Sequence, residues 1–192
     1  FSVTTDGVTI KNLTIKNANY NGDGGAIYFS SSGTVENCNF TGNKATGDYS
    51  YGGAIHMVLG SVENCNFINN TVGKDGGAIM MNSGNVENCN FTANQASDMG
   101  GAIYFYRSPG TVTNCNFAHN SANKGGSILS MQWLGVTADT CIFKTSSDEP
   151  FNTRNLPPTL IVDNFTTVYG SGEKLTFDLR TNSSILVTNG NI

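Results

Sequence analysis

The sequence is poor in charge and lacks any long apolar run. Only 12% of its 192 residues are charged, and 14 acidic against 10 basic side chains give a net charge of −4. Such a chain has no basic surplus that would attract nucleic acid or an anionic membrane surface. No run of 18 apolar residues occurs, so we expect no membrane span in this segment, and Phe1 is not followed by the apolar stretch of a signal peptide.

Helical periodicity is also missing, and short motifs are repeated instead. A Gly-Gly pair and an Asn-Cys-Asn-Phe motif recur with a period of 24 to 28 residues. The pairs begin at Gly24, Gly52, Gly76, Gly100 and Gly125, and the longer motif begins at Asn37, Asn64, Asn88 and Asn114. Repeats of this length indicate a solenoid, in which each unit buries its apolar face only against its neighbours.

Within one period, the apolar residues form short groups with a spacing of two. Ile79 and Met81 come first, then Val86, then Cys89 and Phe91. Alternate residues of a strand face the same side, so each group predicts one short strand. Asn and Gly, which tolerate the left-handed conformation, separate the groups. Three strands and three turns per period predict one coil of a parallel β-helix, with equivalent residues stacked about 4.8 Å apart.

The cysteines fall in one of the predicted inward columns, where Leu13 takes the first place. The column then continues with Cys38, Cys65, Cys89, Cys115 and Cys141. A leucine in the series indicates a site for a small apolar group, and a free thiol is such a group. Stacked neighbours would have Cβ atoms about 4.8 Å apart, whereas a disulfide needs about 3.8 Å. We therefore expect free, buried thiols and no metal, since no Cys-x-x-Cys pair or nearby His joins the column.

Two sets of asparagines recur with the same period. The first set precedes the Leu/Cys column, and we expect it to form an inward amide ladder at a tight turn: Asn12, Asn37, Asn64, Asn88 and Asn114. The second set lies three residues after each phenylalanine: Asn43, Asn70, Asn94 and Asn120. We expect both sets to be structural, because stacked amides satisfy one another's hydrogen bonds.

The alternation of two motifs carries a resemblance to a known family. GGAI occurs four times, and FxxN occurs at Phe40–Asn43, Phe67–Asn70, Phe91–Asn94 and Phe117–Asn120. This doubled pattern resembles the repeats of chlamydial polymorphic outer-membrane proteins, and it resembles the adhesin-like surface proteins of methanogenic archaea more closely. The resemblance implies an all-β, right-handed parallel β-helix that is extracellular, lies at a cell surface and works in attachment.

The repeated motifs no longer occur after Pro150. We expect about six coils in residues 1–149, a linker in 150–158, and a β segment in 159–192. Val168–Leu179 is similar to the opening strands of the immunoglobulin-like modules that follow the helical part in the methanogen adhesins. About 35 residues cannot complete a sandwich of about 100 residues. The segment is therefore a partial module, a cap docked on the helix, or strands completed by another chain; we expect docking.

One outward column is a candidate ligand surface. We expect Tyr28, His56, Met80 and Tyr104 to stack on the outside, with Tyr106 beside them, as an exposed strip rich in tyrosine. Aromatic rings offer flat apolar faces for sugar rings or for a partner protein. The alternative is that a flat sheet simply carries strand-forming residues, or that loops cover the strip.

A second outward feature is acidic. Three glutamates stack in successive coils, at Glu36, Glu63 and Glu87, and aspartates precede the Gly-Gly turns at Asp23, Asp48, Asp75 and Asp98. Like charges this close repel unless they are screened or bridged by a cation such as calcium. Because no loop has the regular oxygen-ligand spacing of a calcium site, we expect solvated carboxylates and no cofactor.

Polysaccharide lyases and hydrolases share this fold, so an enzyme must be weighed against an adhesin. Such an enzyme needs clustered carboxylates with a cation on one outer face. Only Arg107, Arg154 and Arg180 are available, and His56 and His119 fall in different columns. We therefore predict a non-catalytic adhesin or stalk that binds a glycan or protein on another cell, or other copies of itself. The alternatives are a subunit that stacks end to end into a filament and a pectate-lyase-like enzyme.

Overall fold

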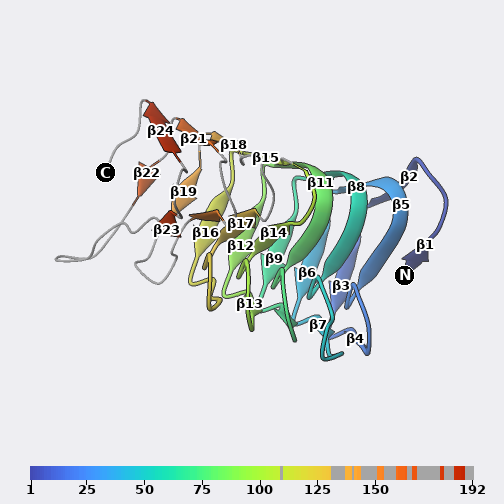
Figure 1. The fold of residues 1–192 in the computed structure, drawn as a ribbon. Coiled ribbons are helices and arrows are strands. Elements are labelled where there is room, and N and C mark those ends of the chain that lie inside the picture. Colours follow the sequence, from blue (N-terminus) through green and yellow to red (C-terminus); the bar gives the residue numbers. More distant parts are fainter. Residues whose placement is uncertain are drawn as a thin grey trace.

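The computed structural model describes the chain in full as far as Ser108 and again from Gly110 to Ile128. Of the later residues it describes Cys141 and the backbone of 129–130, 137–139, 142–143, 151–153, 159–163, 166–167, 178–179 and 184–188. Every element in these residues is a strand, and every strand pairing is parallel. Figure 1 shows the strands of successive coils stacked side by side along one axis. The predicted parallel β-helix is confirmed.

Three sheets form the sides of the helix. The largest has 13 strands, because each coil contributes either one long, bent strand or two short ones. Its members are β1 (Ser2–Val3), β2 (Val8–Lys11), β5 (Ile27–Glu36), β8 (Ile55–Glu63), β11 (Ile79–Glu87), β14 (Ile103–Phe105), β15 (Gly110–Thr113), β17 (Ile128–Ser130), β18 (Thr137–Asp139), β20 (Phe151–Thr153), β21 (Thr159–Asp163), β23 (Asp178–Leu179) and β24 (Ser184–Thr188).

The other two sheets are narrower. The seven-stranded sheet consists of β3 (Thr14–Lys16), β6 (Asn39–Thr41), β9 (Asn66–Ile68), β12 (Asn90–Thr92), β16 (Asn116–Ala118), β19 (Ile142–Phe143) and β22 (Thr166–Thr167). The four-stranded sheet consists of β4 (Asn19–Tyr20), β7 (Lys44–Ala45), β10 (Thr71–Val72) and β13 (Gln95–Ala96). Within the described residues, no helix is long and apolar enough to cross a membrane.

The Gly-Gly pairs return the chain to the largest sheet, and glycine is required at the two positions for different reasons. Gly52 has φ 69°, a left-handed conformation that costs glycine little. A Cβ on Gly53 would lie 2.1 Å from the carbonyl oxygen of Gly77 in the next coil. The first glycine therefore makes the turn, and the second lets neighbouring coils approach closely.

The core is built from stacked columns, as the period predicted. Phe40, Phe67, Phe91 and Phe117 are fully buried, and their rings lie parallel with centroids 4.9 to 5.0 Å apart. This spacing is that of neighbouring strands in a sheet, so the backbone sets it. The structure also places Cys38, Cys65, Cys89, Cys115 and Cys141 in the core as free thiols.

The buried asparagine ladder is the second set and not the first. Asn43, Asn70, Asn94 and Asn120 are fully buried, and the Asn70 side chain donates to Asn94 Oδ1 (2.9 Å) and to the carbonyl of Phe40 (3.1 Å). Each rung also accepts a hydrogen bond from the backbone N–H of the asparagine in the preceding coil, as at Asn43 N to Asn70 Oδ1 (3.0 Å). These amides thereby satisfy backbone groups at a corner of every coil.

The expectation that the first set points inward was wrong. Asn37, Asn64, Asn88 and Asn114 are exposed and have φ between 52° and 55°. A strand alternates inward and outward side chains, but a left-handed residue between two strands interrupts that alternation. In the third repeat, Val86 and Cys89 both face the core, and the corner residue Asn88 turns to solvent.

The described strands beyond Pro150 continue the winding. β20 lies inside the expected linker and pairs in parallel with β17, while β21 pairs in parallel with β18, and β24 pairs in parallel with β21. An immunoglobulin-like opening would form antiparallel hairpins. The described strands of this segment therefore pair with the rod, and the rest of the expected linker and β segment lies outside the described residues.

Candidate functional site

The predicted outer strip is in register, but most of it is covered. Tyr28 pairs with His56, His56 with Met80, and Met80 with Tyr104. His56, Met80 and Tyr104 are 9%, 3% and 1% exposed, whereas Tyr28 and Tyr106 are half-buried. The prediction of an exposed strip is therefore wrong for three of its five residues.

A small apolar cluster outside the main core covers the strip. Met99, which immediately precedes a Gly-Gly pair, packs with Met80 and Tyr104, and Tyr51 and Tyr106 close the cluster at its edges. The turns that lead into the largest sheet thus fold back over its outer side. Burial of these side chains fixes the turns against the sheet.

The part of the strip that stays open is a recess of about 340 Å³ (hereafter the recess). Its lining comes from four successive coils and consists of Asp23, Tyr28, Tyr51, His56, Val58, Met80, Asn82, Tyr106 and Arg107. Aromatic rings, two charged groups and one amide face a volume suited to a small molecule or to one sugar residue of a longer chain.

At one end of the recess, an aspartate holds a histidine and a tyrosine. Asp23 Oδ1 accepts the backbone N–H of Tyr51 (2.9 Å), and Oδ2 lies 3.1 Å from His56 Nδ1. This second contact is a close approach and not a hydrogen bond. The imidazole also meets the edges of two rings, with centroids 5.1 Å from Tyr28 and 6.2 Å from Tyr51. His56 is therefore fixed in the floor of the recess.

The side of the recess is built by a turn that is longer than its neighbours. Five residues separate Ala45 from Tyr51, whereas two separate the paired positions Val72 and Asp75 in the next coil. Ser50 is buried in this turn and donates to the carbonyl oxygens of Gly47 (2.6 Å) and Ala45 (3.1 Å). The extra residues are therefore folded compactly.

Lys74 from the next coil supports this side of the recess. Its ammonium group lies 5.1 Å from the ring centre of Tyr49 and 5.4 Å from that of Tyr51. It also donates to the Tyr51 hydroxyl (3.3 Å), and this hydrogen bond raises the pKa of Lys74. A cation over two ring faces stabilises the arrangement by up to about 1 kcal/mol per ring at an exposed site.

The opposite end of the recess comes from a second departure from the period. Four residues separate Phe105 from Gly110, whereas two separate Met81 from Gly84, their partners in the preceding coil. The backbone N–H groups of Tyr106, Arg107 and Ser108 donate to carbonyls of the preceding coil, at 3.0, 3.2 and 2.9 Å. The loop is thus anchored, and Arg107 stands exposed with its guanidinium carbon 5.5 Å from the Tyr106 ring centre.

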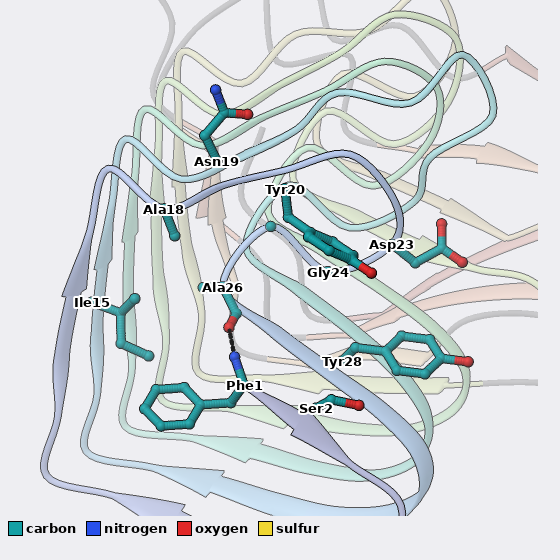
Figure 2. A pocket seen from close by; sticks show the side chains of 11 residues that line it. Phe1, Ser2, Ile15, Ala18, Asn19, Tyr20, Asp23, Gly24, Ala26 and Tyr28 are labelled. Carbon is teal, nitrogen blue, oxygen red and sulfur yellow. Dashed lines mark hydrogen bonds between the residues drawn. The ribbon is translucent and has the colours of Figure 1, made fainter.

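The larger cavity, of about 560 Å³, lies at the first coil (Figure 2). Its walls include Ile15, Ala18 and Ala26, which occupy the inward columns of Phe40, Asn43 and Ala54. It is therefore the end of the core at the first coil. In Figure 2, Asp23 and Tyr28 lie away from Ile15 and Ala18, toward the outer side where the recess begins.

The acidic column is in register but forms no compact cluster. Glu36 pairs with Glu63 and Glu63 with Glu87, all on the outside of the largest sheet. Asn37 donates its side-chain amide to Glu36 Oε1 (3.0 Å). In the part of the chain that the structure describes, no three His, Cys, Asp or Glu residues are placed to hold a metal ion.

Sequence reasoning missed Tyr51 and did not connect Asp23 or Arg107 with the strip. The available signal was the irregularity of the repeat. Two departures from a 24-residue spacing, the residues before Tyr51 and the residues after Phe105, border the recess.

The comparisons with known proteins address the family. A family model described as a right-handed β-helix region matches residues 1–181. No significant match is found among curated proteins or among solved structures. The parallel coils, the stacked columns and this match agree, and the chain belongs to the right-handed β-helix family.

Proposed function

We propose that this chain is a non-catalytic binding segment of an extracellular adhesin or stalk, and that the recess binds a saccharide displayed on another surface. The observation that carries the proposal is the coincidence of two insertions at one place. The repeat is lengthened before Tyr51 and after Phe105, and Tyr51, Tyr106 and Arg107 all line the same recess.

The lining suits a sugar residue. Saccharides present apolar ring faces together with many hydroxyl groups, and such ligands are held by aromatic side chains combined with a few polar ones. The recess offers rings of Tyr28 and Tyr106 with the Asn82 amide and the Asp23 carboxylate. Since it runs across several coils, it can hold one residue of a chain that continues along the rod.

The polar groups of the recess are held for binding and not for proton transfer. His56 is nearly buried, with its Nδ1 facing Asp23, and Asp23 in turn holds the backbone of Tyr51. A general acid or base must reach the substrate within hydrogen-bond distance. The Asp23 and His56 pair instead fixes two walls of the recess.

A glycan array followed by titration of the bound saccharides tests the proposal. We expect Tyr106→Ala to weaken binding about tenfold, because a stacked ring contributes about 1 kcal/mol or more. Leu59→Ala is the matched control, since Leu59 is 50% exposed on β8 and lies outside the recess. Equal losses in both variants, or no retained saccharide, would contradict the proposal.

Incubation with polysaccharides tests the non-catalytic part. We expect no new reducing ends and no unsaturated products, with and without calcium. Product formation that His56→Ala abolishes would show an enzyme instead.

A further inference from the structure

Among the described residues that line the recess, two carry a charge, and they stand at opposite ends. Asp23 lies at the end with Tyr28, and Arg107 lies at the end with Tyr106. Whichever of these charges is still free to meet a ligand decides the charge of the ligand that the recess prefers.

The acidic group at the first end is already engaged. Asp23 Oδ1 accepts the backbone N–H of Tyr51, and Oδ2 faces His56 Nδ1 at 3.1 Å. Two lysines of neighbouring turns also have partners within the protein. Lys74 donates to the Tyr51 hydroxyl, and Lys124 lies 3.6 Å from Asp98 Oδ1.

The basic group at the second end is presented outward. Arg107 is exposed, its backbone N–H donates to the carbonyl of Asn82 in the preceding coil (3.2 Å), and its guanidinium carbon lies over the Tyr106 ring at 5.5 Å from the ring centre. A guanidinium group held over a ring face keeps N–H donors that can meet a ligand. These donors form a fork that matches the oxygens of a carboxylate or a sulfate.

We infer that the recess selects an anionic sugar residue, with its carboxylate or sulfate group on Arg107 and the rest of its ring toward Tyr28. This inference rests on the proposed function and names the ligand class for the same site. The insertion after Phe105 is then a specificity element, because the same two-residue lengthening supplies both the stacking ring and the guanidinium group.

The test uses the full chain and three sets of oligosaccharides of equal length: uronic acid oligomers, sulfated neutral oligomers and unmodified neutral oligomers. Binding is measured by calorimetry at low and at physiological ionic strength. We expect at least one anionic set to bind about tenfold or more tightly than the neutral set, and we expect salt to reduce that difference. The two anionic sets distinguish carboxylate from sulfate recognition.

Variants of Arg107 then assign the preference. Arg107→Gln should remove the difference between anionic and neutral sets while leaving neutral binding within about twofold, and Arg107→Lys should keep part of it. Lys16→Gln, which removes an exposed cation from β3, is the control and should change nothing. Thermal unfolding of each variant checks that the fold is kept.

The outcomes separate the two proposals. Anionic preference lost in Arg107→Gln but kept in Lys16→Gln supports the inference. Neutral binding that equals anionic binding, with no effect of Arg107→Gln, overturns the inference and leaves the saccharide function standing. Absence of binding to all three sets overturns both.

Discussion

Two sides of the same coils follow opposite rules. On the side of the seven-stranded sheet, every full repeat has the same residue at the same place, with phenylalanines, buried asparagines and cysteines stacked at constant spacing. Along the recess, the paired positions hold tyrosine, histidine, methionine and tyrosine, and the turns differ in length. The regular side joins coil to coil, whereas residues and turn lengths on the irregular side vary and form the recess.

The difference follows from how each side is stabilised. A rung of the asparagine ladder must satisfy groups in the coils above and below it, so a different residue would leave buried donors and acceptors unpaired. A side chain that points outward needs only to avoid its neighbours. Regularity is therefore required inside the coil, and variation is tolerated outside it.

The largest expected effect is a break in the inner ladder. Asn70→Leu removes the acceptor for the Asn43 backbone and side chain and the donor to Phe40, and each orphaned buried group costs about 1–3 kcal/mol. We expect the free energy of unfolding to fall by about 4 kcal/mol or more in urea denaturation. A loss below about 1 kcal/mol would show that the ladder does not join the coils.

The cysteine column should make the regular side sensitive to alkali. The neighbouring Cys89 thiol and then burial raise the pKa of Cys65 far above its ordinary value of 9.0, and burial does the same for Cys89. Below pH 9 these thiols are protonated in both states. As the pH rises further, only the unfolded chain loses the protons, so stability decreases by about 1.4 kcal/mol per pH unit for each thiol.

Urea unfolding between about pH 8 and 10, with a reductant present, checks this slope. Cys65→Ala should lower the free energy of unfolding at pH 8 through the cavity that it creates. Above pH 9 it should make the decrease of that free energy with pH smaller by about 1.4 kcal/mol per pH unit, the contribution of one thiol. Parallel curves for the two proteins would contradict the assignment to Cys65.

The third prediction restores the regular repeat on the irregular side. Residues 106–109 are replaced by Asn-Ser, which stands at the paired place in the preceding coil at Asn82 and Ser83. We expect the free energy of unfolding to change by less than about 1 kcal/mol, because short loop changes are cheap. Saccharide affinity should fall more than tenfold with the loss of the ring and the guanidinium group. A variant that binds normally would move the site away from the recess.

The smallest effect is expected for the outer amide ladder. Asn66 donates to Asn39 Oδ1 and accepts from Asn90, both at 2.8 Å. Water can replace these partners because Asn66 is partly exposed, so Asn66→Ala should cost only about 0.5 kcal/mol. A cost near that of Asn70→Leu would show that stacking itself, and not burial, holds the ladders together.

The sequence predicted the core of this protein more accurately than it predicted the site. The Ile, Phe and Cys columns follow from spacing alone, because residues one period apart must stack once the chain winds. The strip was correctly aligned, but its exposure was wrong for His56, Met80 and Tyr104. Exposure depends on the turns of neighbouring coils, and the local pattern does not show that Met99 folds back over the strip.

The sequence by itself determined the winding, since a repeated pattern of short apolar groups has no other way to bury its apolar side chains. Only the tertiary structure decided which asparagines face inward, because the left-handed corner at Asn88 interrupts the alternation on which sequence patterns depend. Only the tertiary structure brought Asp23, His56 and Arg107 to one recess, because residues from different coils meet there and their distances depend on how each turn folds.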